Sequence, residues 1–61
     1  SLVRVSSFQL LVNGRPVATN ANVSAPAFIL TPATGTNRIS VRAMNGNFVV
    51  GESDWTELIA P

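Results

Sequence analysis

Apolar and polar residues alternate along much of this chain, and the longest regular stretch is Asn37–Met44. Its side chains alternate strictly between two sides, with Ile39, Val41 and Ala43 on one side and Arg38, Ser40, Arg42 and Met44 on the other. A period of two is typical of a half-buried β-strand. Turn-forming residues flank the stretch, Thr34-Gly35-Thr36 before it and Asn45-Gly46-Asn47 after it. The pattern predicts that Asn37–Met44 is the central strand of a sheet.

A hairpin is predicted nearer the start of the chain. Phe8–Val12 alternates, with Phe8, Leu10 and Val12 on one side, and it runs into Asn13-Gly14. Asn-Gly is the strongest short-range hairpin signal, because a type I′ turn needs positive φ at both central positions. The returning strand, Arg15–Thr19, contains Pro16, which has no N–H to donate. We therefore expect this strand at an edge of the sheet.

The remaining segments are also short and extended. Ala27–Thr31 alternates after Pro26 and is predicted to be a strand. Phe48–Val50 follows the second hairpin signal, Gly51 is predicted to mark a bulge, and Ser53–Ile59 is the last extended piece. No segment has apolar residues at helical spacing. The sequence predicts a single all-β domain over residues 1–61, a small antiparallel β-sandwich or open barrel of five or six short strands.

Composition adds a requirement for a partner. A chain of 61 residues buries only a small core, and this one has neither Cys nor His, so disulfides and ordinary zinc sites are excluded as stabilising elements. Charged residues make up 11% of the chain, against about 25% in a typical soluble domain. We interpret the low charge as surface that a protein partner covers, by self-association or within a larger assembly. The alternative is a small, weakly charged domain of a longer protein.

Charge and composition also exclude several functions. The net charge of +1 does not favour nucleic-acid binding, and no apolar run is long enough to span a membrane. The absence of His and Cys removes the commonest general base, metal ligand and thiol nucleophile. The acids Glu52, Asp54 and Glu57 have no partner base in the sequence and are expected to be solvated. We therefore expect no catalytic, metal or cofactor site and no enzymatic activity.

Several of these motifs together resemble the second half of a fibronectin type III or related immunoglobulin-like domain. The resemblance covers about Phe8–Ile59: Phe8–Gly14 resembles strand C and its turn, Phe28–Leu30 strand E, Gly35–Asn45 strand F, and Glu52–Trp55 the start of strand G. The chain has no Tyr for the usual corner hydrogen bond of strand F, and Asn37 or Ile39 stands near that place. The residues before Phe8 are too few for the family's first two strands. The resemblance implies binding or spacing rather than catalysis.

The candidate site is therefore a partner interface. Arg38 and Arg42 share the outward side of the central strand and are suited to carboxylate or phosphate partners, or to keeping the sheet soluble. Trp55, the one Trp, is suited to packing in the core or between subunits, and a sugar-stacking role is the alternative. The predicted interface set is Leu2, Val3, Val5, Leu11, Arg38, Arg42, Trp55 and Leu58.

The function predicted from these features is that of a non-enzymatic structural module. A small subunit of a larger assembly, such as a phage virion decoration, cement or tail-associated protein, fits the size, low charge and missing disulfides, which places it on a virion surface. The alternative is a fibronectin-III-like spacer or carbohydrate-binding module of a larger extracellular protein. In either setting the expected mechanism is burial of an uncovered apolar face together with pairing of an edge strand.

Overall fold

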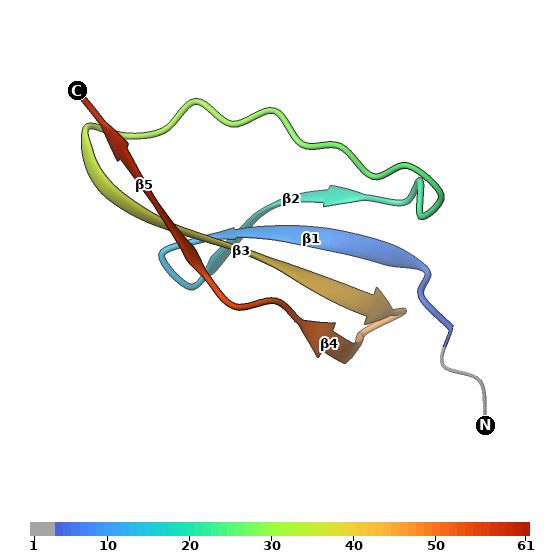
Figure 1. Cartoon of the computed structure of the whole chain (residues 1–61). Coiled ribbons are helices and arrows are strands. Elements are labelled where there is room, and N and C mark those ends of the chain that lie inside the picture. Colours follow the sequence, from blue (N-terminus) through green and yellow to red (C-terminus); the bar gives the residue numbers. More distant parts are fainter. Residues whose placement is uncertain (1–3) are drawn as a thin grey trace.

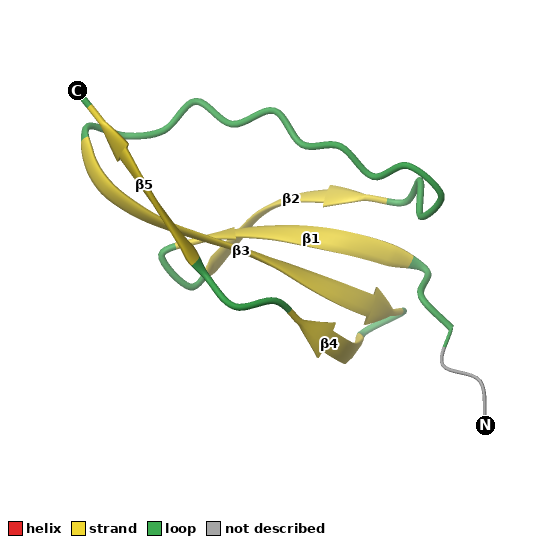
Figure 2. Ribbon diagram, viewed as in Figure 1, coloured by secondary structure: helices red, strands yellow, loops and turns green. Residues whose placement is uncertain are grey.

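The structure, a computed structural model, describes residues 4–61, which form one antiparallel sheet of five strands with no helix among them (Figures 1 and 2). The strands are β1 (Ser7–Val12), β2 (Arg15–Asn20), β3 (Gly35–Asn45), β4 (Phe48–Glu52) and β5 (Thr56–Ala60). Within these residues no helix is long and apolar enough to cross a membrane. The predicted all-β class is confirmed.

β3 is the centre of the sheet, as predicted. The strand order is β2-β1-β3-β4, and β5 also pairs with β3. On one side β3 pairs with β1, and on the other side it pairs first with β5 over Gly35–Ile39 and then with β4 over Arg42–Asn45. β4 and β5 therefore lie end to end along one edge of β3, joined by residues 53–55 (Figure 1).

Both predicted hairpin turns are present, and both depend on positive φ. Asn13 has φ 53° and Gly14 has φ 82°, as a type I′ turn requires between β1 and β2. Gly46 has φ 58° in the turn between β3 and β4. Because few residues other than Gly and Asn adopt this conformation readily, these two turns set the ends of the central strands.

The edges carry the irregularities that the prolines and glycines predicted. β2 lies at one edge, and its pairing with β1 shifts so that Leu10 is opposite Ala18 while Leu11 is opposite Pro16. Val17 is thus an extra residue beside the proline. In β4 the register shifts between Ala43–Gly51 and Met44–Val49, so that Val50 is an extra residue next to Gly51. Both bulges interrupt the regular pairing, one beside Pro16 and the other beside Gly51.

The register divides the side chains between two faces of the sheet. The first, which we call the apolar face, carries Phe8, Leu10, Val12, Ile39, Val41, Ala43 and Leu58. The second, which we call the groove face, carries Gln9, Leu11, Arg38, Ser40, Arg42 and Met44. The buried hydrophobic residues are split between them, with Leu10 on the apolar face and Leu11 and Met44 on the groove face.

The segment 21–34 runs without regular secondary structure from β2 to β3 (Figure 2). The segment lies over the apolar face, because two asparagines on that face donate hydrogen bonds to its backbone. Asn20 Nδ2 donates to the Ala27 carbonyl at 2.7 Å, and Asn37 Nδ2 donates to the Ala33 carbonyl at 2.9 Å. The predicted strand at Ala27–Thr31 is wrong. Its alternation is real, since Phe28 is half-buried while Ile29 is 99% exposed, but no neighbouring strand pairs with its backbone.

Residues 4–61 thus form one twisted sheet with an irregular cover, and the second, facing sheet of the predicted sandwich is not found among them. The chain is also more extended than a compact domain. Its radius of gyration is 12.3 Å, whereas about 10.5 Å is expected for 61 residues. The sheet therefore lacks a second regular layer within the part of the chain that the structure describes.

Candidate interaction surfaces

A groove of about 570 Å³ lies on the groove face. One wall is the β1–β2 turn at Asn13 and Gly14, and the other is the β4–β5 connection at Ser53, Asp54 and Trp55. Leu11, Ser40 and the two arginines Arg38 and Arg42 lie between the walls, with Glu52 beside them. The volume is within the range of small-ligand sites, although the lining is more polar than is usual for them.

The first wall is fixed by a side chain that extends the sheet. Beyond Val12, the last residue of β1, the N–H of Asn13 donates to the Arg38 carbonyl at 2.8 Å. In return, the N–H of Arg38 donates to Oδ1 of Asn13 at 2.9 Å. The Asn13 side chain therefore replaces a backbone carbonyl in the β1–β3 ladder, and it holds the backbone of Arg38 at the groove.

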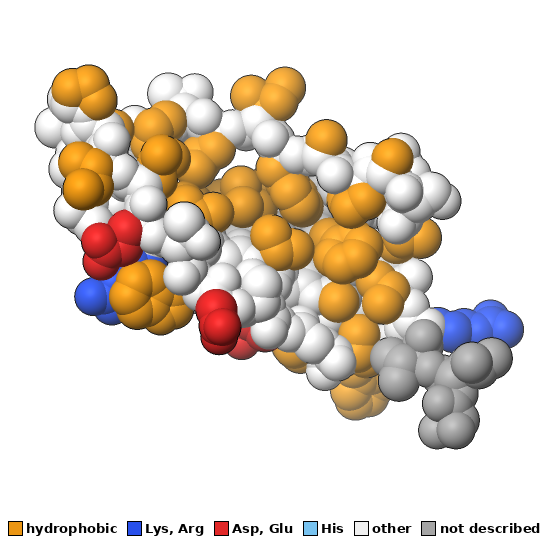
Figure 3. Space-filling view, in the orientation of Figure 1, with side chains coloured by type: hydrophobic (Ala, Val, Ile, Leu, Met, Phe, Trp, Pro, Cys, Tyr) orange, Lys and Arg blue, Asp and Glu red, His pale blue; other side chains and the backbone are white. Residues whose placement is uncertain are grey.

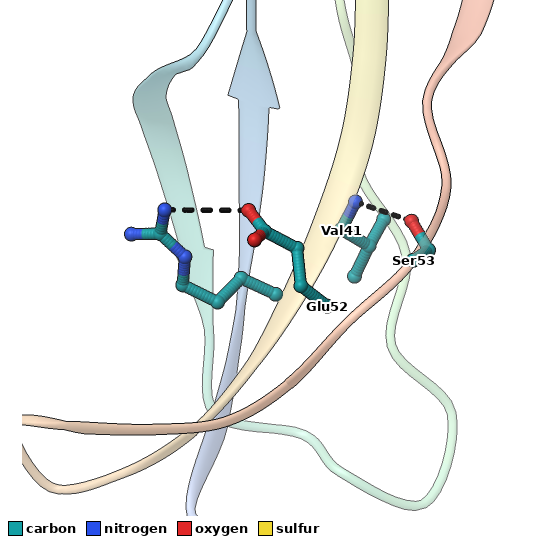
Figure 4. Close-up of polar contacts among 4 residues, drawn as sticks. Val41, Glu52 and Ser53 are labelled. Atoms are coloured by element: carbon teal, nitrogen blue, oxygen red, sulfur yellow. Dashed lines mark hydrogen bonds and ion pairs between the residues drawn. The ribbon is translucent and has the colours of Figure 1, made fainter.

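The second wall is fixed in the same way. Between β4 and β5, the N–H of Ser53 donates to the Val41 carbonyl at 2.8 Å, and Ser53 Oγ accepts the N–H of Val41 at 2.9 Å (Figure 4). The serine hydroxyl takes the place of the missing backbone acceptor. Asp54 and Trp55 can then leave the ladder without leaving the Val41 N–H unpaired.

Charges in the groove are of both signs. Nη2 of Arg42 lies 3.3 Å from Oε1 of Glu52, which is the carboxylate drawn in Figure 4. Both side chains are partly exposed, so this ion pair contributes at most about 1 kcal/mol. The Nε of Arg42 and the Oε1 of Gln9, which face each other in register, are buried without a hydrogen-bond partner. Polar groups therefore remain unsatisfied beneath the groove.

Trp55 and Arg38 form the most distinctive contact of the groove. The Arg38 guanidinium carbon lies 4.4 Å from the centroid of the Trp55 ring, within the range of a cation–π interaction. The Trp55 side chain is still 54% exposed. The contact orients a large aromatic surface at the rim of the groove, where it is accessible to a ligand or a protein partner.

The groove offers recognition chemistry. Carboxylates, guanidinium groups, a serine hydroxyl and one indole line it. Among residues 4–61 no three His, Cys, Asp or Glu side chains are grouped so that they could hold a metal ion. A nucleophile activated by a neighbouring base is not found in its lining either. The arrangement is suited to binding a polar ligand or a protein surface.

The apolar face is the second candidate surface. Hydrophobic side chains gather across the middle of the molecule, alongside the 21–34 segment, in Figure 3. Phe8, Val12, Ile39, Val41 and Ala43 are only half-buried there. Leu58 is 41% exposed at the β5 end, and Phe48, opposite Asn45 on the same face, is 77% exposed at the β4 end. The 21–34 segment thus leaves this face partly open, chiefly at its β4 and β5 ends.

The structure separates the predicted interface residues. Leu11, Arg38, Arg42 and Trp55 all line the groove, whereas Leu58 lies on the opposite, apolar face. Leu11 is fully buried beneath the groove, so its side chain stabilises the fold and is not an exposed contact. Val5 is half-buried before β1, and Leu2 and Val3 lie outside the described residues. The predicted set therefore does not form a single surface.

Exposure separates Trp55 from the core and Met44 from Phe48. Trp55 does not belong to the core of this chain, because about half of its surface is in contact with solvent. Met44 is buried on the groove face, and Phe48 is exposed on the apolar face. Their separation follows from the pleat, which places the two side chains on opposite sides.

Sequence reasoning missed the residues that complete the ladders. Asn13 was recognised as a turn residue, and its side-chain acceptor role was not predicted. Ser53 and Ser6 act similarly: Ser6 Oγ donates to the Met44 carbonyl at 3.2 Å and accepts the N–H of Gly46 at 2.9 Å. Asn and Ser next to a strand end are the signal that such a replacement is available.

Comparison with protein-family models, curated proteins and solved structures found no significant match to this chain.

Proposed function

We propose that the chain is a non-enzymatic structural module that assembles with a second copy through its apolar face. The observation that carries this proposal is the half-buried row on β1 and β3, which within residues 4–61 has no cover but the irregular 21–34 segment. A sheet with one open apolar face is normally packed against a second layer. A second copy supplies such a layer, since its own apolar face has the same shape and composition.

The exposed area supports a partner of ordinary size. The chain has a solvent-accessible surface of 4604 Å². A compact monomer of 6.4 kDa is expected to expose about 3,800 Å². The excess of about 800 Å² matches the area that one partner buries in a standard protein interface. If an interface buried this excess, the chain would expose the area expected of a compact monomer of its mass.

Strand order supports the resemblance to fibronectin type III and immunoglobulin-like domains. In that family strands C, F and G are neighbours in one sheet, and the opposite sheet covers its inner side. β1, β3 and the β4–β5 edge, which the resemblance equates with C, F and G, are neighbours in the same order. The apolar face corresponds to the inner side. The prediction that this module belongs to a virion surface or to an extracellular protein stays a prediction.

The test compares two adjacent exposed residues on opposite faces. Phe48 is 77% exposed on the apolar face, and Val49, opposite Met44 on the groove face, is 53% exposed. Sedimentation equilibrium on the 61-residue chain is expected to detect dimers or larger species for the wild type. Phe48→Ser should weaken association more than tenfold, because a buried aromatic at an interface contributes more than about 1.4 kcal/mol. Val49→Ser should change it little.

A wild-type chain that is monomeric up to millimolar concentration would overturn the proposal. Equal effects of the two substitutions would also count against it, because the proposal places Phe48 in the interface and Val49 on the opposite face. Circular dichroism of each variant checks that the sheet is retained. This control is sound because neither side chain is part of the buried core.

A second candidate function is recognition of a glycan in the groove. The half-exposed Trp55 ring, oriented by Arg38 and flanked by Asp54, supports it, because sugars bind to aromatic faces with hydrogen-bonding groups beside them. Trp55 is the one Trp of the chain, so its fluorescence reports directly on the groove. Titration with a broad panel of glycans should shift the emission if a sugar binds. An unchanged spectrum across the panel would remove this candidate.

A further inference from the structure

The edges of the sheet differ in how well they are protected. β2 has Pro16 and an extra residue at Val17, and β4 has an extra residue at Val50. Bulges and prolines at an edge prevent other strands from pairing with it. β5 has neither over Thr56–Ala60, and it pairs with β3 in an unbroken register. Within residues 4–61, β5 is therefore the edge strand that has neither a bulge nor a proline.

The hydrogen bonds of β3 identify the free backbone groups of β5. The N–H and C=O of Arg38 point toward β1, where they bond to Asn13, and those of Val41 point the other way, toward Ser53. Because bonding direction alternates along a strand, Asn37 and Ile39 bond to β5, and their partners there are Leu58 and Thr56. The N–H and C=O of Glu57 and Ile59 consequently face outward.

We infer that β5 pairs antiparallel with β5 of a second copy, about a two-fold axis at Leu58. In this register Glu57 of one chain lies opposite Ile59 of the other, and each such pair exchanges both backbone hydrogen bonds. A two-fold axis at Glu57 would place two carboxylates directly opposite each other, which is unfavourable. An axis at Ile59 would place Glu57 opposite Pro61, which has no N–H. Repulsion between carboxylates excludes the axis at Glu57, and the missing N–H of Pro61 excludes the axis at Ile59, so the axis at Leu58 remains.

The apolar face supports the same register. Leu58 lies on that face and is 41% exposed, so an axis at Leu58 brings the two leucines together. The two apolar faces then become continuous across the junction. This edge contact is distinct from the face-to-face contact proposed above. Used together, the two contacts build assemblies larger than a dimer, while each alone gives a dimer.

The experiment uses charge to test the register. Ile59 is 71% exposed, so I59E places a second carboxylate opposite Glu57 of the partner without disturbing the core. Cross-strand pairs contribute about 0.2–1 kcal/mol each, and the two-fold axis repeats the pair, so I59E should weaken association by about two- to thirty-fold in sedimentation equilibrium at low salt. I59K, which instead places a lysine opposite Glu57 of the partner, should not weaken association. V49E, which adds the same charge on the groove face of β4, should have a smaller effect.

Equal losses for I59E and V49E, or a loss in I59K equal to that in I59E, would overturn the edge pairing. A wild-type chain that stays monomeric would overturn both contacts. If Phe48→Ser weakens association while the charge variants do not, the face contact stands and the edge pairing is wrong. If the charge variants behave as expected while Phe48→Ser has no effect, the edge pairing stands and the face contact is wrong.

Discussion

Asn37 is the buried polar residue on which the cover of the sheet depends, and replacing it tests how the 21–34 segment is held. Its side chain is 2% exposed. Nδ2 lies 2.9 Å from the Ala33 carbonyl, and 3.4 Å from the carbonyls of both Gly35 and Leu58. One amide thus connects the end of the 21–34 segment, the start of β3 and β5. Asn37→Ala removes all of these contacts.

The size of the effect follows from the geometry. One short hydrogen bond and two long ones from a buried amide are lost, so we expect the free energy of unfolding to fall by about 1–3 kcal/mol. For a chain of this length that corresponds to roughly 5–20 °C in the unfolding midpoint. Asn20→Ala is the matched control. Asn20 also donates to the segment, at 2.7 Å to Ala27, but in an exposed position where water can replace it.

Urea unfolding followed by circular dichroism at one fixed protein concentration measures both variants. Asn20→Ala should cost at most about 0.5 kcal/mol. N37D adds a pH test, because an ionised carboxylate has no donor for the Ala33 carbonyl, whereas the protonated acid keeps one. N37D should therefore be more stable at pH 3 relative to wild type than at pH 7. Equal, small effects of Asn37→Ala and Asn20→Ala would refute the reasoning.

Two further predictions concern the turns and the broken edge. Gly14→Ala should lower the free energy of unfolding by about 1 kcal/mol, because Gly14 has φ 82°. Gly51→Ala is the control and should not lower it, because an added Cβ has equally open space there and Gly51 has no positive φ. Equal urea midpoints for the two variants would contradict this. Ser53→Ala should leave the N–H of Val41 without its acceptor and so speed the hydrogen exchange of Val41. Ser53→Thr keeps the hydroxyl and should leave the exchange rate unchanged. Unchanged protection of Val41 in Ser53→Ala would show that water replaces the serine.

The sequence was most informative where chemistry is local. Asn13-Gly14 and Asn45-Gly46-Asn47 predicted their turns because Gly and Asn adopt positive φ readily, and Asn13, Gly14 and Gly46 do so here. Pro16 predicted an edge strand for a similar reason, since a residue without an N–H is excluded from the middle of a sheet. The alternation of Asn37–Met44 predicted the strand that pairs on both sides.

Sequence reasoning failed where a residue depends on neighbours distant along the chain. Ala27–Thr31 alternates as a strand does, but pairing needs a second backbone, and residues 4–61 provide none beside it. Trp55 was expected to pack in the core or between subunits; its position on a connection that leaves the ladder places it at a groove and outside the core of this chain. The burial of Asn37 depends on carbonyls of Ala33 and Leu58, which no local pattern brings together.

The central claim is that the open apolar face of the sheet is covered by a second copy of the chain. The most direct test is the thermal unfolding midpoint of the wild-type chain measured from micromolar to millimolar concentration. Because association stabilises the folded state by mass action, the midpoint should rise continuously with concentration. A sharp transition at one temperature across the whole range, with a monomeric mass throughout, would contradict the claim.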